Sequence, residues 1–547
     1  MEKKYDSIVN EKSQHTLLEK QNAKEEYELF MNQKHLTNKA SSYAYTHNQD
    51  ERMNKEFFKK QQKRKRARSA ITSILKQDHL IPTPDNIVKW EDNSKGLMLI
   101  MQDFWKNILR KRIDDNDQEA IDARNSILTN FEHFLAENEL GINEDDFQKL
   151  DQNVSKEEIL EAIDGIKLGK ACGKDGLPIE FYATHTRVDD EDINSNYLTK
   201  ILYKMFLESQ NRGELPTTLK ENIVTLIFKK EFEQDKVYTK NYRPITLQNL
   251  DYKILYKVLA NRLKKVIHKL VPYYQYAYVP KRRISDGILL MKAIIHKINN
   301  SQKGAAALFM DAEKAFDSVD HKFTIEILKK LKLPDNFIKW ISMAFDSSQM
   351  QLIINGYLTD PFSMDGGGKQ GDPLYPYIFI IVMGALAALI ETDVSIEGIK
   401  LKHSETSIKT FQYADDCPYL IGSPNDILHI KQHLVTFCKA SGMKINDDKT
   451  DLFLLGKWAN EPPAPLLQSG FKIVNQKDTL RVLGIKLGTP NSHSINWLKV
   501  ISKIRNYTAN NQSTHLTLNG QILLANACIT YQTIFVSTHY QHINTHL

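Results

Sequence analysis

Two apolar segments that end in aspartate most constrain the fold of this chain. One is the run 305–310, which is followed by Asp311, and the other comprises the runs that flank Asp415 and Asp416 in the stretch 410–421. Apolar and aromatic runs on both sides of two acids predict a β-hairpin with the acids at its turn. An isolated Asp-Asp turn is usually structural, because Asp bonds its own backbone there. If the strand 305–310 neighbours the hairpin, three carboxylates converge, as two-metal phosphoryl transfer requires.

The length allows several domains, and the composition is ordinary for a soluble globular protein. The 547 residues are 41% hydrophobic and 26% charged, with a net charge of +6. Cations gather in the run 59–68, which is either a solvated helix face or a nucleic-acid contact. The four cysteines are scattered without ligand spacing, which argues against zinc sites and disulfides. We therefore expect an intracellular protein of the cytoplasm, the nucleus or both.

The sequence predicts no membrane association. Met1 is followed by charged and polar residues, so no signal peptide is expected. The longest apolar run, 377–390, is too short to cross a bilayer and predicts a buried helix. Residues 1–70 are rich in Lys, Glu, Gln and Asn and poor in aliphatics, which predicts exposed helix or disorder. Helical spacing begins at Ser69.

The middle of the chain alternates helices, loops and one strand. A capping box at Ser155 predicts a helix through Ile166, followed by the Gly- and Lys-rich loop 169–176. This loop either holds a backbone phosphate or is a plain turn. A helix is expected over 197–208 and a strand over 223–228, directly before Lys229 and Lys230.

Cations and aromatics alternate further along. The sequence predicts that residues 241–245 form a loop that leads into a basic amphipathic helix, 250–270. In that loop Arg243 stands before a proline, where it either grips phosphate through its two-pronged guanidinium or makes a surface ion pair. The segment 273–283 interleaves tyrosines with Lys and Arg, which suits either a nucleic-acid track or a boundary between core and surface.

An ordered set of motifs resembles the reverse transcriptases of non-LTR (LINE-type) retrotransposons. The resemblance covers roughly residues 55–535, and the matches follow the family's order. They include Phe57-Phe58, 169–176, 241–245 with 250–255 and 259–263, the first palm motif 311–317, the motif 367–374, the catalytic hairpin 413–416, the fourth motif 442–449 and the primer-grip region 483–485.

The resemblance implies a role for each matched residue. Asp311, Asp415 and Asp416 would hold two Mg²⁺ ions, with Mn²⁺ as an alternative, and Lys449 would protonate the leaving pyrophosphate. Phe316 stands at the family's steric-gate position against a ribose 2′-hydroxyl. The remaining residues expected to bind the nucleotide are Lys229, Lys230, Arg243, Ala312 and Gln370.

The implied fold is α+β, in the right-hand polymerase arrangement of fingers, a palm with an antiparallel sheet and a helical thumb. The expected segments are a charged N-terminal segment 1–68, a helical N-terminal extension 69–215, fingers 216–300, palm 301–490 and a thumb 491–547, which we expect to be incomplete. No endonuclease, ribonuclease H or Cys/His region is recognisable. A longer element with an endonuclease region outside this chain is therefore expected.

The implied function is RNA-directed DNA polymerisation, with an RNA template, a DNA primer and dNTPs as partners. The sequence departs from the family at four positions. The family commonly has Arg at the positions of Lys369 and Gln521, and a small hydroxyl residue at that of Tyr375. Pro418 removes a backbone donor where the strand of the catalytic hairpin normally continues. These departures leave a second hypothesis open: a decayed or repurposed copy that binds nucleic acid without chemistry.

Overall fold

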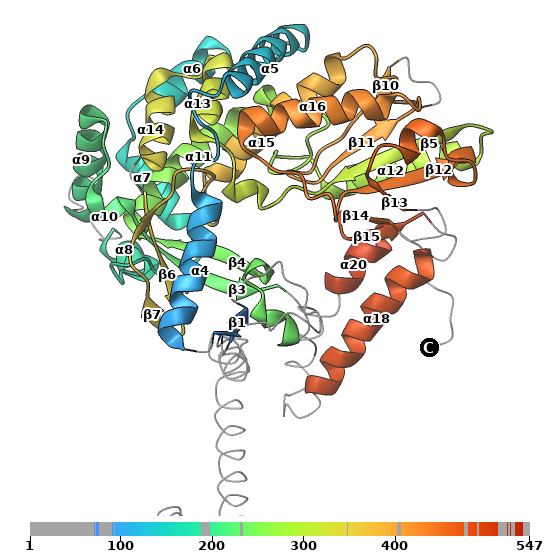
Figure 1. The fold of residues 1–547 in the computed structure, drawn as a ribbon. Coiled ribbons are helices and arrows are strands. Elements are labelled where there is room, and N and C mark those ends of the chain that lie inside the picture. Colours follow the sequence, from blue (N-terminus) through green and yellow to red (C-terminus); the bar gives the residue numbers. More distant parts are fainter. Residues whose placement is uncertain are drawn as a thin grey trace, which may run out of the picture. The chain divides into compact units, whose positions relative to one another are not determined.

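A computed structural model gives the fold drawn in Figure 1. The chain divides into two compact units. Its described residues are 71, 73–75, 90–91, 93–186, 197–229, 233–346, 348–401, 406–474, 480–488, 492–511, 522, 526 and 531–539. The first unit extends from residue 66 to 492, and the second combines 1–65 with 493–547. Helices and sheets mix throughout the first unit, which is the α+β class predicted from the sequence.

The sheet that carries the predicted acids has β5 (Gly304–Met310) at its centre. The strand order is β11-β5-β12-β13, where β11 is Cys417–Ile421, β12 is Asp451–Gly456 and β13 is Lys472–Val474. β5 runs antiparallel to both neighbours, and β13 runs parallel to β12. Small, fully buried alanines at 305–307 let flanking elements approach this strand closely.

Helix α15 (Tyr375–Thr392) is the core helix of the unit. Every residue from Ile378 to Ile390 is buried, and the helix packs against α5 (Gln118–Glu137), α13 (His321–Lys330) and α16 (Asp426–Ser441) (Figure 1). Among the described residues it alone is long and apolar enough to cross a membrane, yet 78% of it is enclosed by the protein. The prediction of a buried helix at 377–390 is confirmed.

A second sheet brings distant parts of the chain together. Its order is β4-β3-β6-β7, with β8 also paired to β6. The strands are β3 (Glu221–Phe228), β4 (Tyr242–Gln248), β6 (Gln349–Ile354), β7 (Tyr357–Leu358) and β8 (Phe362–Ser363). Helix α4 (Ser94–Leu109) packs Leu97, Met101, Trp105 and Leu109 against it, an i, i+4 series on one helix face. This sheet joins strands from both sides of the predicted boundary at residue 300.

The prediction of a loop at 241–245 is wrong, because these residues enter strand β4. Pro244 lies opposite Leu226, within a continuous antiparallel ladder to β3. Proline lacks a backbone donor and is tolerated where its nitrogen faces away from the ladder partner, as on an edge strand. β4 is the edge of its sheet, so the proline does not interrupt it.

Helices from the N-terminal part pack on α11 (Leu250–Leu270) and on one another. α6 (Glu144–Asp151) and α7 (Lys156–Asp164) contact α11, α8 (Ile179–His185) and α9 (Tyr197–Arg212) contact α7, and α10 (Thr217–Lys220) contacts β3. The predicted capping box at Ser155 opens α7. Arg262 of α11 is buried and donates to both carboxylate oxygens of Glu158, at 2.6 and 2.7 Å, and to three backbone carbonyls. It fastens α7 to α11.

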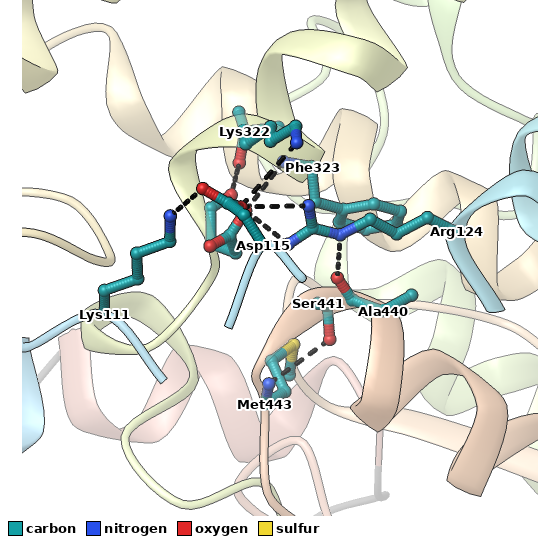
Figure 2. A network of polar contacts seen from close by, with 10 residues as sticks. Lys111, Asp115, Arg124, Lys322, Phe323, Ala440, Ser441 and Met443 are labelled. Carbon is teal, nitrogen blue, oxygen red and sulfur yellow. Dashed lines mark hydrogen bonds and ion pairs between the residues drawn. The ribbon is translucent and has the colours of Figure 1, made fainter. Parts of the chain in front are cut away.

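A buried ion pair fastens α5 to the unit's centre (Figure 2). Arg124 is 4% exposed and donates to Asp320 Oδ1 at 2.8 Å and to the Ala440 carbonyl at 3.1 Å. Asp320 also caps α13 by accepting from the Phe323 backbone N–H at 2.8 Å. Removing one partner of such a pair leaves an uncompensated buried charge, at a cost of roughly 3–5 kcal/mol.

The remaining elements complete the two units. The first unit also contains β1 (Ile74–Leu75), β2 (Trp90–Glu91), α12 (Ile284–Asn299), α14 (Asp335–Phe345), β9 (Ile399–Lys400), β10 (Ser407–Ile408), α17 (Ala464–Leu467), β14 (Leu480–Val482) and β15 (Ile485–Leu487). In the second unit α18 (Ser492–Asn511) and α20 (Tyr531–Ser537) share a small apolar cluster of Trp497, Val500 and Val536. The basic run 59–68, Phe57-Phe58, Lys230 and Gln521 lie outside the described residues.

Candidate active site

Asp415 and Asp416 lie at the tip of the predicted hairpin. Tyr413 and Asp416 exchange both backbone hydrogen bonds, at 2.9 and 3.2 Å, so Ala414 and Asp415 form a two-residue loop. Ala414 has a φ of 59°, which is the left-handed geometry that tight hairpin turns require at this position. The turn places Asp415 and Asp416 directly before the first residue of β11.

Asp311 is brought to the same place by strand register. Cys417 of β11 lies opposite Met310 of β5, so Asp416 and Asp311 each stand one residue beyond this pair, at the same end of the sheet. The condition set by the sequence, that the two strands are neighbours, is met. The Asp311 carbonyl accepts from the Asn446 N–H at 2.8 Å, and its N–H donates to Thr450 Oγ1 at 3.3 Å. The fourth motif thus fixes the backbone of the first.

The three carboxylates affect one another electrostatically. Burial, followed by the negative charges of Asp415 and Asp311, raises the pKa of Asp416 to about 6. The pKa of Asp415 is also raised, by burial and then by Asp311. Both residues reach solvent at the hairpin tip, yet enough protein surrounds them to remove part of their hydration. Each carboxylate therefore carries a charge that a nearby cation would stabilise.

Three cations surround the acids. Lys449 Nζ lies 3.7 Å from Asp311 Oδ2. Arg243, exposed on β4, lowers the pKa of Asp415 against the larger effect of burial. Arg481, on β14, acts on Asp416 in the same way. Arg481 was not predicted from the sequence, and the only signal available was its position two residues before the primer-grip motif.

A lysine pair lies beside this set. Lys314, in the left-handed region with a φ of 49°, donates to the Tyr242 carbonyl at 2.9 Å and lies 4.5 Å from the centre of the Trp105 ring. Burial lowers the pKa of Lys314, and the adjacent Lys229 lowers it further. Burial likewise lowers the pKa of Lys229. Lys314 was missed because its approach to β3 and β4 depends on tertiary packing.

Gln370 is held by a buried acid. Its amide Nε2 donates to both oxygens of Asp317, at 3.1 and 3.0 Å. Asp317 is 2% exposed, and its burial raises its pKa. The sequence placed Asp317 inside a motif but assigned it no role. The structure makes it the anchor of the Gln370 side chain.

Phe316 is supported by two other rings. It stacks on Phe379 with centroids 4.1 Å apart and meets Tyr375 edge-on at 6.0 Å. Its own side chain is only partly buried. The ring is therefore braced by α15 while part of it faces outward. Ala312, the other motif residue predicted to bind the nucleotide, forms an isolated backbone bridge with Ile445.

The departures from the family fit their surroundings. The Lys369 ammonium is buried and lies 4.0 Å from the centre of the Tyr252 ring, and Tyr252 donates to Asp372 at 2.7 Å. Pro418 pairs with Phe309, and its carbonyl accepts from Thr410 Oγ1 at 3.0 Å. The hairpin closes despite the missing proline donor.

The predicted nucleic-acid track at 273–283 divides into two kinds of residue. Arg282 donates to the carbonyls of Pro272 and Gln275, so it supports the loop from within. Tyr273 is 74% exposed. Tyr278 is half exposed with a φ of 58°, and partial burial, followed by the charge of Asp415, raises its pKa. Exposed tyrosines beside an arginine that bonds backbone carbonyls fit a boundary between core and surface at least as well as a nucleic-acid track.

The acids suit hard divalent cations by their chemistry. All three present oxygen ligands, and their mutual repulsion is what a divalent cation would relieve. Among the described residues, the structure shows no group of three or more Asp, Glu, His or Cys side chains that could hold a metal ion as placed.

A family model and several curated proteins match this chain, and they point to the same family. Residues 227–487 match the family model described as reverse transcriptase (RNA-dependent DNA polymerase). The chain is 27% identical over 319 residues to the Transposon TX1 uncharacterized 149 kDa protein of Xenopus laevis, across 58% of this chain and 23% of that protein. It is 28% identical over 301 residues to a retrovirus-related Pol polyprotein from type-1 retrotransposable element R2 of Popillia japonica, across 54% of this chain and 39% of that protein.

A third relative is named for its activity. The probable RNA-directed DNA polymerase from transposon BS of Drosophila melanogaster is 23% identical over 341 residues, which is 60% of this chain and 35% of that protein. In all three cases the match spans less than half of the relative.

Proposed function

We propose, since this chain carries a reverse transcriptase domain of the non-LTR retrotransposon type, that it is an RNA-directed DNA polymerase. It would extend a DNA primer on an RNA template with dNTPs. The observation that carries the proposal is the register of β5 and β11, which brings Asp311 beside Asp415 and Asp416.

In the proposed reaction the primer 3′-hydroxyl loses its proton to water and its oxygen attacks the α-phosphorus of the dNTP. The bond between that phosphorus and the bridging oxygen of the β-phosphate breaks, and pyrophosphate leaves. Two Mg²⁺ ions held by Asp311, Asp415 and Asp416 would supply stabilisation of negative charge on the attacking and leaving oxygens. Lys449, 3.7 Å from Asp311, would donate a proton to the departing pyrophosphate. Arg243 and Lys229 would contact the triphosphate, and Lys230 is proposed for the same role from the sequence alone.

Two residues would shape the rest of the nucleotide pocket. Phe316, braced by Phe379 and Tyr375, would occupy the space of a ribose 2′-hydroxyl. Gln370, fixed by Asp317, would lie along the nascent base pair, with Ala312 next to the sugar. The finer assignment of fingers, palm and thumb belongs to the same proposal, as does an endonuclease region in a longer parent protein.

The proposed location is intracellular, in the cytoplasm, the nucleus or both. Cys172, Cys417 and Cys438 are free thiols, which fits a reducing compartment.

Primer extension tests the proposal. The protein, an RNA template with an annealed DNA primer, dNTPs and Mg²⁺ should give full-length product. The variants Asp415→Asn and Asp416→Asn should retain a normal melting curve and lose product, because each removes charge without removing bulk. Absence of product from well-folded wild-type protein would instead support the second hypothesis, a repurposed copy that binds nucleic acid without chemistry.

A further inference from the structure

Helix α16 ends directly before the fourth motif, and its end is held from outside the helix (Figure 2). Carbonyls at a helix C-terminus have no partner within the helix and need one elsewhere. Here three consecutive carbonyls accept from other parts of the chain. The pairs are Arg124 Nε to Ala440 at 3.1 Å, the Asp320 N–H to Ser441 at 2.8 Å and Arg112 Nη1 to Gly442 at 3.4 Å.

The residue that caps α16 is closely surrounded as well. Gly442 has a φ of +75°, the left-handed conformation that commonly ends a helix. A Cβ at this position would lie 3.4 Å from the Ser318 carbonyl oxygen and 3.5 Å from Ile113 Cγ1. The backbone therefore leaves the helix at a place fixed by the loop before α5 and by the segment that follows the first motif.

The chain then runs along the first motif to Lys449. The Glu313 N–H donates to the Lys444 carbonyl at 2.8 Å, and the Asn446 N–H donates to the Asp311 carbonyl at the same distance. The Lys449 N–H donates in turn to the Asn446 carbonyl at 3.1 Å. Because the Lys449 side chain is 67% exposed, its own packing does not place it. The distance of 3.7 Å from Lys449 Nζ to Asp311 Oδ2 therefore depends on the course of the backbone.

Arg124 is suited to hold this course because one guanidinium bonds two groups in fixed directions. It is 4% exposed, and Nη2 donates to Asp320 Oδ1 at 2.8 Å while Nε donates to Ala440. Helix α5 thus joins the end of α16 to the residue that caps α13. Arg112 and Arg124 lie outside the residues 227–487 that match the reverse transcriptase family model, and the proposed reaction uses neither.

We propose that Arg124, supported by Arg112, is a positioning residue for Lys449. It fixes the end of α16, and thereby the path of 443–449 that brings the Lys449 ammonium beside Asp311. The inference rests on the proposed function for the chemical part that Lys449 plays. The alternative is that Arg124 only fastens α5 to the unit, and the test separates the two.

Hydrogen exchange followed by mass spectrometry tests the positioning without any synthesis. In the wild type the peptide 443–450 should exchange slowly, since the N–H groups of Asn446, Lys449 and Thr450 are hydrogen-bonded. Arg124→Gln should raise its exchange rate by about tenfold, the value of one charge-assisted hydrogen bond. The peptide 156–164, which forms α7, should keep its wild-type rate.

Arg262→Gln is the matched control. Arg262 is also buried and also donates to a carboxylate and to backbone carbonyls, but it holds α7 on α11. This variant should give the reverse pattern, with faster exchange in 156–164 and wild-type exchange in 443–450.

Single-turnover incorporation of one nucleotide tests the link to Lys449. Arg124→Gln should lower the maximal rate by roughly 10- to 100-fold, because a displaced acid catalyst loses most of its effect. The dNTP concentration that gives half of that rate should not change. Lys449→Gln should cost roughly 100-fold. In that background Arg124→Gln should cost no more than about twofold further, since both changes remove the same interaction.

A second variant guards against unfolding. Arg124→Gln leaves Asp320 as a buried charge without its partner, whereas Arg124→Gln/Asp320→Asn removes both charges and keeps an oxygen that can cap α13. It should show the same faster exchange in 443–450 and the same loss of rate. A melting curve accompanies each variant, and the measurements are made well below the transition.

Two results would overturn the inference. One is wild-type exchange in 443–450 in both Arg124 variants, and the other is an equal loss of rate from Arg124→Gln with and without Lys449. Either would mean that Arg124 only holds α5 in place. Faster exchange in 443–450 of the Arg124 variants, in a protein whose wild type makes no product, would sink the proposed function and leave the positioning of this segment standing.

Discussion

At the scale of single residues, Phe316 offers the sharpest test of the nucleotide pocket. Phe316→Ala should let rNTPs enter, because the ring would no longer fill the position of the 2′-hydroxyl. A steric exclusion of about 2–4 kcal/mol corresponds to a fall in dNTP-over-rNTP selectivity of roughly 30- to 700-fold. The measurement is the ratio of rNTP to dNTP incorporation. Because Phe316 is only partly buried, the stability cost should be below the roughly 3–5 kcal/mol of a fully buried Phe.

Phe345→Ala is the matched control for Phe316. Phe345 is also partly buried, and its ring centroid lies 6.4 Å from that of Tyr375. It lies outside the first palm motif, and its ring stacks on His321. It should lower the melting temperature without changing sugar selectivity. An unchanged sugar preference in Phe316→Ala, together with a much lower melting temperature, would mean that Phe316 only packs.

A second residue-scale prediction concerns pH. Glu391 lies in the last turn of α15, and burial raises its pKa from 4.5 to about 7. Between pH 4.5 and about pH 7, Glu391 is therefore protonated in the folded state and ionised in the unfolded state. Stability is lost as the pH rises through that window, and the loss is complete above about pH 7. Glu391→Gln should raise the free energy of unfolding by about 1–3 kcal/mol at pH 8 and by nothing near pH 4.

Urea denaturation between pH 4 and 9 measures this effect. Glu137, in the last turn of α5, is exposed, so Glu137→Gln should change stability little at any pH. A Glu391→Gln variant with the same stability difference at pH 4 and pH 8 would contradict the linkage.

At the scale of elements, the sequence predicted those helices whose formation depends on residues close together in the chain. The helix 250–270 and the capping box at Ser155 appear as predicted, because helical periodicity and capping are local. β4 was predicted as a loop, since the effect of Pro244 depends on its place at a sheet edge. Pairing of β5 with β11 could be stated only as a condition, because register between strands a hundred residues apart is a tertiary property.

The site divides in the same way. The acids could be predicted because each ends an apolar run. Asp317, Lys314 and Arg481 could not, since their roles arise from packing against Gln370, Lys229 and Asp416. The contacts that hold the end of α16 come from Arg112, Arg124 and Asp320, and no single segment of the sequence predicts them.

At the scale of the whole molecule, the distribution of cations predicts how nucleic-acid binding responds to salt. The net charge is only +6, so long-range attraction is weak and binding must depend on local clusters. In α11 not every cation is available, because Arg262 pairs with Glu158 and Lys269 pairs with Asp146. Lys264 and Lys265 remain exposed on that helix.

The prediction is that affinity for duplex falls steeply with ionic strength and depends little on sequence, because phosphate contacts release counterions and read no bases. Lys264→Gln/Lys265→Gln should reduce the slope of log affinity against log salt by roughly 0.9 for each phosphate that the variant no longer neutralises. The same measurement on a variant with Lys63, Arg64, Lys65 and Arg66 all changed to Gln tests the basic run 59–68. If both variants keep the wild-type slope, neither the helix nor the run touches the backbone, and the binding surface is confined to the cations around the three acids.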